Sequence, residues 1–599
     1  MQPIHTLFAA PPAKRYSSVK SSSQYLTMRD GTQIAVDIML PGDLPPGTTV
    51  PVIMLMARYW RSMDMIMPNP PNKALIGPRE FIADDLIPRG FAVVVVDGRG
   101  TGASTGVNRY PWSPDERADH GEVARWVLSQ PWCNGRIGAV GISYEGSTAH
   151  YLLGSGVEGV KSAAPMEYEF DVYTDVALPG GIFNTAFIQE WNASNQRLDN
   201  NRPSSLFPWL VRLLVKGVRP VDSDRQTRTV LTQALRDHRA NTDVHAAMST
   251  VTFRDDVFGN TGVTLDDFSI FKQQADFEAA GGVLFIWGSW LDGTTADTVL
   301  RTFNTFSNPQ ISVIGAWKHE MTAHGSPFLA PKSKPNPLQG EQWAAVAQFF
   351  EQTLRQDQAP VGKTLFYYTL GEESWKQTKQ FPLPNTDTQT WYFQEQGGLS
   401  TQAPTAAKAD DPYTVDFETS TGLTNRWHTP MAKPLNYPDR AKADRRLLTY
   451  TSAPLMQDIE VTGYPVVTLY AASTEEDNAF FVYLEDVDEQ GVVGYVTEGE
   501  LRGIHRPLST EAPPYWMGMP YRTFKRADAA PMPRNEMVEL TFGLQPTSVL
   551  FRRGHRIRIA IAGADHGTFA RIPAQGNPVW RIARSAGMAS CIRLPVVKR

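Results

Sequence analysis

Residues 135–146, Gly135-Arg136-Ile137-Gly138-Ala139-Val140-Gly141-Ile142-Ser143-Tyr144-Glu145-Gly146, decide the fold of this chain. Their apolar run reads as a buried strand, and residues 147–153 that follow can form a helix. A serine at so sharp a strand-to-helix turn is typical of a nucleophile elbow, where flanking glycines accept a strained backbone. The alternative is an ordinary turn whose serine caps a helix, because Glu145 stands where G-x-S-x-G has its second glycine. This segment alone leaves both interpretations open.

Strands and helices alternate around this turn. Upstream, Asp30-Gly31 separates two strand-like runs and predicts a β-hairpin. Further strands are expected at 50–57, 91–97 and, less strongly, 158–164, with helices at 78–86 and 115–130. Such alternation predicts an α/β fold with a mostly parallel sheet.

The pattern changes twice further along the chain. Residues 166–280 have helical stretches, such as 209–218 and 227–240, and no strong strand, which predicts a helical cap inserted into the α/β domain. The α/β pattern returns at 281–288 and 310–315, and beyond about 360 short apolar runs between turn residues predict an all-β jelly roll. We therefore expect a mobile leader at 1–23, an α/β-hydrolase domain at 24–165 and 281–358, the cap at 166–280, and the jelly-roll domain at 359–599.

Composition excludes several classes of function. The chain has 599 residues, 42% of them hydrophobic and 20% charged, as is ordinary for a globular protein. A net charge of -5 gives no footprint for nucleic acid or an anionic membrane. No apolar run could span a bilayer, and the first residues lack the features of a signal peptide, so we expect a cytoplasmic protein. The oligomeric state stays open, a homo-oligomer included.

A nucleophilic serine needs a general base and an acid that orients the base. In the α/β-hydrolase arrangement these follow in the order serine, acid, histidine, each in a loop after a strand. Asp292 follows the strand expected at 281–288, and His319 follows the one at 310–315. Asp297 and His324, which lie further from the strand ends, are the second choices. The placement favours catalysis by Ser143, Asp292 and His319.

An acyl-transfer enzyme also needs donors for the oxyanion. One is expected from the backbone N–H of Tyr144, the residue after the nucleophile. Tyr59, in the loop after the strand at 50–57, can supply a hydroxyl, although an aromatic packed at a sheet edge is equally compatible with the sequence. Residues 97–103 imitate a dinucleotide-binding fingerprint but continue as loop, and Cys133 has no partner at metal-ligand spacing, so no cofactor or metal is expected.

Several motifs together resemble the serine hydrolases of the cocaine esterase and Xaa-Pro dipeptidyl-peptidase group, which includes α-amino-acid ester hydrolases. The resemblance covers nearly the whole chain after the leader and rests on residues 98–106, 131–138, 141–146, 290–293, 315–319 and 554–558. It implies an α/β-hydrolase domain, a helical cap and a C-terminal jelly roll. It also implies Ser143, Asp292 and His319 as the triad, with Tyr59 and the Tyr144 amide as the oxyanion hole. In this group the second elbow glycine comes one position later, which accounts for Glu145 and Gly146.

The residues after Asp292 restrict the classes of substrate that we expect. α-Amino-acid ester hydrolases have acidic residues there, and cocaine esterase has an aromatic; Gly293-Thr294-Thr295 argues against both substrate classes. We expect a cofactor-free serine hydrolase of a small carboxylic ester or amide. Alternatives are an Xaa-Pro dipeptidyl-peptidase, an acyltransferase with a non-water acceptor, and a non-catalytic protein whose jelly roll binds carbohydrate. The peptidase would need acidic residues for a substrate amine, for which Glu167, Glu169 and Asp171 are candidates.

Overall fold

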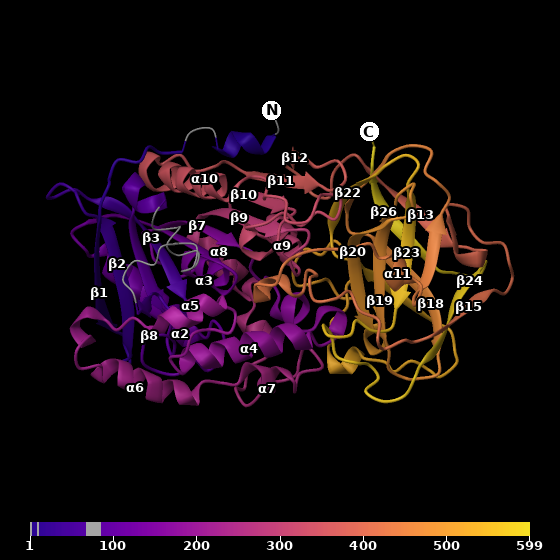
Figure 1. The fold of residues 1–599 in the computed structure, drawn as a ribbon, viewed down its shortest axis with the longest axis horizontal. Helices are drawn as coiled ribbons and strands as arrows, with labels where there is room; N and C mark the ends of the chain where they lie inside the picture. Colours follow the sequence, from indigo (N-terminus) through magenta and orange to yellow (C-terminus); the bar gives the residue numbers. More distant parts are fainter. Residues whose placement is uncertain (1–2, 9–10, 67–84, 599) are drawn as a thin grey trace.

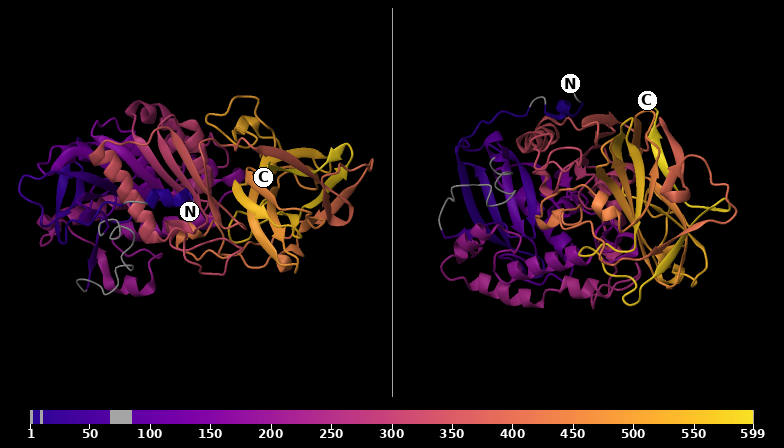
Figure 2. Two further views of the ribbon diagram at one scale, coloured as in Figure 1. Left: turned by 90° about the horizontal axis from the view of Figure 1, so that it is seen from above. Right: turned by 45° about the vertical axis from the view of Figure 1, so that its right-hand side comes forward.

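Two β-sheets organise the computed structural model of the chain, which describes residues 3–8, 11–66 and 85–598 (Figure 1). The first sheet is mixed, with helices between its strands, and the second is almost wholly antiparallel. The sheets lie side by side along the long axis of the molecule, as the view from above also shows (Figure 2). The helix expected at 78–86 lies largely outside the described residues.

The first sheet contains ten strands in the order β1-β2-β5-β3-β6-β7-β9-β10-β11-β12. The predicted hairpin is confirmed, since β1 and β2 pair antiparallel with Thr27 opposite Gln33. Seven strands from β5 to β11 in this order run parallel and are mostly buried on both faces, as their continuous apolar runs require. The strands are β1 (Val19–Thr27), β2 (Gln33–Pro41), β3 (Val50–Ala57), β5 (Ala92–Asp97), β6 (Cys133–Ile142), β7 (Val160–Met166), β9 (Val283–Ser289), β10 (Gln310–Gly315), β11 (Lys363–Thr369) and β12 (Ser374–Thr378).

Four helices connect consecutive parallel strands: α2 (Pro114–Leu128), α3 (Tyr144–Leu153), α9 (Thr295–Thr305) and α10 (Gln339–Glu351). Strands β3, β6, β7, β9 and β10 are successive neighbours in the sheet. Because parallel strands end at one edge, the loops that follow these five strands meet there, which is where open α/β sheets bind their ligands. This edge brings together segments that are up to 260 residues apart in the sequence.

The chain between β7 and β9 leaves the sheet and is largely helical, with α4 as its longest helix (Figure 1). The helix expected at 209–218 ends early, at Leu214, and the next residues form strand β8 (Val215–Val218), which pairs with β4 (Met63–Met65). The β-branched Val215 and Val218 favour this extended pairing over a further helical turn. The helices are α4 (Thr185–Asp199), α5 (Trp209–Leu214), α6 (Thr229–Asp237), α7 (Val244–Met248) and α8 (Gln274–Ala280).

The second sheet has fourteen strands, drawn in orange and yellow in Figure 1, and all of them lie after residue 385. Residues 363–378 were expected in this C-terminal domain, but β11 pairs in parallel with β10, so β11 and β12 extend the first sheet. The strands are β13 (Thr386–Phe393), β14 (Gly398–Ser400), β15 (Asp410–Thr414), β16 (Leu448–Ser452), β17 (Ile459–Gly463), β18 (Val466–Ser473), β19 (Ala479–Val487), β20 (Val493–Arg502), β21 (Val538–Gly543), β22 (Thr547–Phe551), β23 (Arg556–Ala562), β24 (Val579–Ser585), β25 (Met588–Ala589) and β26 (Cys591–Val597).

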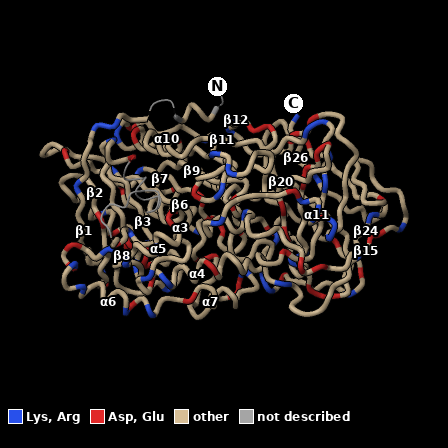
Figure 3. The backbone as a smooth tube through the Cα atoms, in the orientation of Figure 1, with Lys and Arg blue, Asp and Glu red and all other residues tan. Residues whose placement is uncertain are grey.

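Both sheets share one cluster of buried apolar side chains, which includes Val94 of the first sheet and Phe551 of the second. Ile4 is buried in the same cluster, and β1 begins at Val19, so part of the stretch expected to be a mobile leader packs on the fold. Among the described residues, no helix is both long and apolar enough to cross a membrane. Basic and acidic residues are interspersed over both halves (Figure 3).

Candidate active site

Ser143 is the single residue between β6 and α3. Its backbone has φ 62° and ψ −129°, a conformation that costs energy for any residue with a side chain. The Ser143 N–H donates to Met166 O over 2.9 Å, which ties the turn to the neighbouring strand β7. Such strain is stored where a side chain must be presented in a fixed direction. The turn is therefore a nucleophile elbow in its geometry.

Two glycines let the strand and the helix approach each other at this turn. A Cβ atom at Gly141 would lie 2.0 Å from Glu145 O, and one at Gly146 would lie 2.7 Å from Met166 O. Both contacts are with backbone atoms, which cannot move aside without moving the turn. Gly146 therefore takes the place of the second glycine of the usual motif, and Glu145 is accommodated as a buried residue of α3.

Asp292 and His319 form a buried hydrogen-bonded pair. His319 Nδ1 lies 2.8 Å from Asp292 Oδ2, and neither side chain is more than 9% exposed. With Nδ1–H donating to the carboxylate, Nε2 is left as the acceptor, which is the tautomer a general base needs. Burial lowers the pKa of His319, but the carboxylates of Asp292 and Glu167 outweigh it and raise the pKa. His319 can therefore accept a proton at Nε2, and the neighbouring carboxylates stabilise the imidazolium that results.

Asp297 and His324, the second choices for acid and base, make other contacts. Asp297 lies on α9, where Arg301 donates to its carboxylate over 2.6 Å and the Tyr464 hydroxyl also donates to it. His324 is buried, its ring packs against Tyr368, and its Nδ1 faces the backbone N–H of Ser326 at 3.1 Å. These contacts leave Asp292 as the carboxylate that is paired with the candidate base.

Three consecutive residues after β3 are held by helix α4, and Tyr59 is the central one. The Trp191 indole N–H donates to the Tyr59 hydroxyl over 2.9 Å, and Trp60 Nε1 donates to Leu198 O over 3.2 Å. An indole N–H only donates, so the Tyr59 oxygen accepts here and this hydrogen bond does not use the Tyr59 O–H as a donor. Burial raises the pKa of Tyr59, which keeps the phenol protonated.

The loop that carries Tyr59 is also fixed by charge. Arg58 donates two hydrogen bonds, of 2.7 and 3.0 Å, to the carboxylate of Asp199 at the end of α4. Both side chains are buried, so the bidentate ion pair is costly to break from one side. Helix α4 thus holds the loop at Arg58, Tyr59 and Trp60.

Tyr144 contributes its backbone and its ring in different directions. Its N–H is the first of helix α3 and has no acceptor within the helix. Its hydroxyl donates to Glu116 at 2.8 Å, and its ring stacks on Trp112 with centroids 4.6 Å apart. The side chain therefore anchors the elbow, while the amide at the helix N-terminus is oriented toward negative charge.

Ser143 lines a small pocket with Tyr59, Tyr144 and Glu169, which we call the Ser143 pocket. Its remaining wall is apolar and includes five aromatic side chains: Pro111, Trp112, Val172, Val176, Phe187, Ile188, Trp191, Val244, Met248, Phe258 and Phe268. A larger depression, which we call the outer depression, is lined by residues such as Arg109, Asp243 and Asn260 and lies on another face of α7. Among the described residues, the Ser143 pocket brings a serine hydroxyl together with two groups suited to bind an oxyanion.

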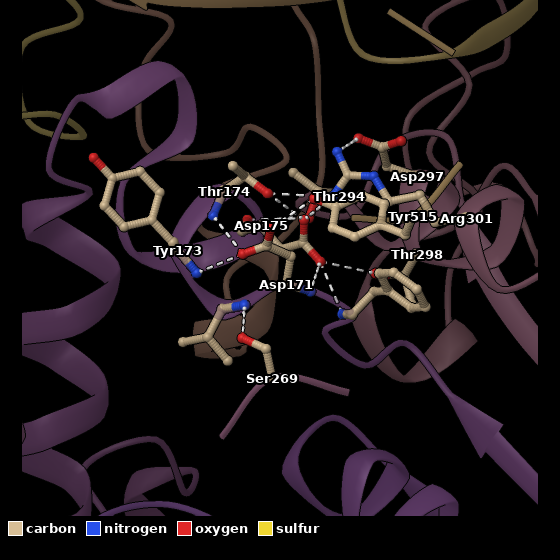
Figure 4. Close-up of polar contacts among 12 residues, drawn as sticks. Asp171, Tyr173, Thr174, Asp175, Ser269, Thr294, Asp297, Thr298, Arg301 and Tyr515 are labelled. Carbon is tan, nitrogen blue, oxygen red and sulfur yellow. Dashed lines mark hydrogen bonds and ion pairs between the residues drawn. The ribbon is translucent and has the colours of Figure 1, made fainter. Parts of the chain in front are cut away.

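The three acidic residues considered as amine anchors lie in different surroundings. Glu169 lines the Ser143 pocket, accepts from Ser147 Oγ over 3.2 Å, and has its pKa raised to about 7 by burial. Asp171 is buried outside that pocket, where it accepts from Arg254 at 2.5 Å and from Tyr515 at 2.6 Å. Figure 4 shows Asp171 within a network that also contains Asp175, Arg301 and Asp297.

Glu167 lies beside the imidazole. Its Oε2 is 3.5 Å from His319 Nδ1 and accepts from the Glu320 N–H over 2.5 Å. The side chains of Glu167, Asp292 and His319 bring one ligand-type atom each within 4.8 Å of one another, a spacing at which a metal ion could also bind. The 2.8 Å hydrogen bond to Asp292 already uses His319 Nδ1, however, so the trio fits a triad with an added carboxyl.

Sequence reasoning missed two of these neighbours. Thr429, from the C-terminal part of the chain, donates to Asp292 Oδ1 over 2.6 Å, and nothing in the local sequence points to it across 137 residues. Glu167 was weighed only as an amine anchor. Its position directly after β7, whose end lies at the same sheet edge, was the signal that could have placed it near the triad.

Comparison with known protein families covers most of the chain. Residues 30–321 match the model of the X-Pro dipeptidyl-peptidase (S15 family), and residues 353–579 match that of the X-Pro dipeptidyl-peptidase C-terminal non-catalytic domain. A protein of Mycobacterium bovis that carries the name serine esterase is 40% identical over 98% of this chain and 96% of its own. The cocaine esterase of Rhodococcus sp. is 25% identical over 97% and 99% of the two chains.

Solved structures share the fold over the same extent. An aminopeptidase from a marine sediment Thaumarchaeota archaeon superposes with a TM-score of 0.73 at 17% identity, covering 98% of both chains. An alpha-amino acid ester hydrolase gives a TM-score of 0.70 at 19% identity, again over 98% of both. At these identities the likeness concerns the arrangement of the chain and not its substrate.

Proposed function

The chain belongs to the family of serine hydrolases that contains cocaine esterase and the X-Pro dipeptidyl-peptidases of family S15, and from this premise we propose the residues that carry its reaction. It is a serine hydrolase that cleaves an ester or amide bond through an acyl-enzyme. In our proposal Ser143 is the nucleophile, His319 the general base and Asp292 the acid that orients His319. The 2.8 Å pair of His319 and Asp292, at the sheet edge where Ser143 directly follows strand β6, carries the assignment.

The reaction proceeds in two halves. The Ser143 hydroxyl gives its proton to His319 Nε2 as its oxygen attacks the substrate carbonyl, and the imidazolium returns the proton to the leaving alcohol or amine. Water then repeats the step on the acyl-enzyme, with His319 again as the base. Asp292 keeps Nδ1–H in place and stabilises the imidazolium that forms in both halves.

The oxyanion is bound by the Tyr144 N–H and the Tyr59 hydroxyl. Support comes from the helix N-terminus at Tyr144, from the shared pocket lining, and from the hydrogen bond in which Tyr59 accepts from Trp191. Because α4 fixes the Tyr59 loop through Arg58, the donor is held in place before the charge develops, which is the condition for strong stabilisation of a transition state.

The acyl group lies in the Ser143 pocket. Its walls are mostly apolar side chains, several of them aromatic, so we propose a small ester or amide with an apolar acyl part. In the same proposal the first sheet and its helices form an α/β-hydrolase domain, residues 166–280 a helical cap, and the second sheet a jelly roll. We further propose that the enzyme works in the cytoplasm.

A covalent probe tests the catalytic assignment without knowledge of the substrate. Wild-type protein should react with a fluorophosphonate at Ser143, as located by mass spectrometry, and should hydrolyse at least one member of a panel of chromogenic esters and amides. Ser143→Ala should abolish labelling and lower kcat by a factor on the order of 10⁶. An active Ser143→Ala variant, or labelling at another serine, would refute the assignment.

A second candidate is favoured by one observation, the carboxyl group of Glu169 in the wall of the Ser143 pocket. Together with the aromatic rings of Trp112 and Trp191 it could bind a substrate ammonium group, as a peptidase that removes N-terminal Xaa-Pro dipeptides requires. Turnover of a chromogenic Xaa-Pro amide should then fall at least ten-fold in Glu169→Gln, while turnover of a neutral aryl ester stays within about two-fold. Equal losses on both substrates would contradict this second candidate.

A further inference from the structure

The catalytic acid of the proposed triad is contacted from both sides of its carboxylate. Oδ2 faces His319 Nδ1, and Oδ1 accepts a hydrogen bond of 2.6 Å from the hydroxyl of Thr429. Thr429 lies in the part of the chain that matches the C-terminal non-catalytic domain, and its side chain is 1% exposed. Asp292 itself is fully buried, so bulk solvent does not reach Oδ1.

The loop that carries Thr429 docks on the loop that carries Asp292. The Gly293 N–H donates to Arg426 O over 2.9 Å, and Arg426 Nε donates back to Gly293 O over 2.7 Å. Together with the Thr429 hydroxyl, three hydrogen bonds join residues 426–429 to residues 292–293. Arg426 is fully buried, which makes this contact rigid and costly to open.

We propose that Thr429 is a positioning residue of the reaction, through which the C-terminal domain holds the Asp292 carboxylate in the orientation that His319 needs. This inference rests on the proposed function of Ser143, Asp292 and His319. Thr429 touches neither substrate nor reacting atoms and acts only through Asp292.

The physical reason is that both oxygens of the buried Asp292 carboxylate need hydrogen-bond donors. A carboxylate in a dry site needs donors on both oxygens, and an oxygen left without one keeps the cost of its lost hydration. Without the Thr429 hydroxyl, Oδ1 would have to turn toward another donor, and that rotation would draw Oδ2 away from His319 Nδ1. The imidazole would lose its fixed tautomer and the partner for its positive charge.

Three variants test the proposal in the full-length protein, with the second-order rate of fluorophosphonate labelling at Ser143 as the first readout. Thr429→Val keeps the shape and removes the hydroxyl, and we expect labelling about ten-fold slower, which corresponds to about 1.4 kcal/mol. Thr429→Ser keeps a hydroxyl and should label within about two-fold of wild type. Thr541→Val, which removes a buried hydroxyl 2.9 Å from Thr468 in the second sheet, is the matched control and should also stay within two-fold.

The second readout separates positioning from general stability. On a chromogenic ester that the wild type cleaves, Thr429→Val should lower kcat with KM nearly unchanged, at a temperature below the unfolding midpoint of every variant. In an Asp292→Asn background the same substitution should add nothing, because the residue through which it acts is already disabled. Should the apolar methyl group of valine impair folding, Thr429→Ala removes the hydroxyl without putting another group in its place.

The possible results divide the two hypotheses. Wild-type protein that is not labelled at Ser143 would overturn the proposed function and the inference with it. Wild-type labelling together with undiminished labelling of folded Thr429→Val would overturn the inference alone. The same holds if Thr429→Ser is as slow as Thr429→Val, or if Thr429→Val slows labelling equally in the Asp292→Asn background.

Discussion

Glu167 Oε2 lies 3.5 Å from His319 Nδ1, the same nitrogen that is hydrogen-bonded to Asp292. Both carboxyl groups are fully buried, and Glu167 Oε1 has no hydrogen-bond partner. Burial, followed by the charge of Asp292, raises the pKa of Glu167 well above its usual range. The imidazole therefore faces one carboxylate and a second carboxyl group whose titration is coupled to its own.

This relationship predicts the pH dependence of the enzyme. His319 must be neutral to accept the Ser143 proton, and its raised pKa means that kcat/KM should rise with pH through an apparent pKa above the ordinary value of about 6.5. A positively charged His319 lowers the pKa of Glu167 and so favours its ionisation, and the ionised carboxylate stabilises the imidazolium in return. Glu167→Gln should therefore move this acid limb to lower pH. A pH profile of kcat/KM measures the shift.

The control for that profile is Glu320→Gln. The charge of Glu320 also raises the pKa of His319, but by less than the charges of Asp292 and Glu167 do. The acid limb of Glu320→Gln should move less than that of Glu167→Gln. The Glu320 backbone N–H, which donates to Glu167, is unchanged by the substitution. An acid limb that is identical in wild type and Glu167→Gln would contradict the proposed coupling.

Tyr59→Phe should lower kcat by about 10²–10³ if the hydroxyl binds the oxyanion, because a donor that meets charge mainly in the transition state affects kcat more than KM. The ring would still fill its place against Tyr144, with centroids 6.3 Å apart. Steady-state kinetics on a chromogenic ester give both constants. Tyr110→Phe, which removes a hydroxyl lining the outer depression, serves as the control and should leave kcat within about two-fold.

Substitution of the two candidate acids, Asp292 and Asp297, should affect different properties: catalysis in one case and stability in the other. Asp292→Asn should lower kcat by about 10⁴, as expected when the base loses its orienting carboxylate, with little change in the unfolding midpoint. Asp297→Asn should instead destabilise the fold, by about 3–5 kcal/mol, because buried Arg301 loses one of its two carboxylate partners. Denaturant unfolding and kcat together measure the contrast, and the opposite pairing of effects would reassign the acid.

Gly146→Ala should damage the elbow although it adds a single methyl group. The new Cβ would lie 2.7 Å from Met166 O and 3.0 Å from the Cβ of Tyr168, so β7 or α3 must shift and Ser143 with it. We expect a loss of stability of about 1–3 kcal/mol and a slower rate of fluorophosphonate labelling.

The matched control is Gly340→Ala. Gly340 is exposed in helix α10, and a Cβ there would meet nothing within 4 Å. This substitution should raise stability by about 0.5–1 kcal/mol and leave labelling unchanged. A Gly146→Ala variant that matched the control in both respects would show that the elbow tolerates a side chain.

Local sequence was enough for the features that depend on neighbours along the chain. The Asp30-Gly31 turn predicts the hairpin of β1 and β2, and the buried apolar runs predict parallel strands. A strand followed by Gly141 and Ser143 predicts the elbow. Since the ends of parallel strands share an edge, the order Ser143, Asp292, His319 could be read from the strand ends alone.

Pairing across the sheets was beyond local patterns. The run at 215–218 continues the helical stretch expected from residue 209, although its valines favour an extended chain, and its pairing with Met63–Met65 makes it a strand. Residues 363–369 resemble the β strands that follow them, and only the parallel register with Gln310–Gly315 assigns them to the first sheet. Whether such a segment forms a strand, and in which sheet, depends on the strand that lies beside it. The sequence of the segment alone does not specify that neighbour.

By itself, the sequence determined the α/β organisation and the strained serine turn, and it placed the residues that we propose as acid and base after later strands, because each of these features depends on residues close together in the chain. Only the tertiary structure decided the rest of the site. Glu167 meets His319 because β7 and β10 end at one edge, and Thr429 meets Asp292 because two domains pack together. A hydrogen bond across 137 residues is fixed by packing, for which no local spacing is a signal.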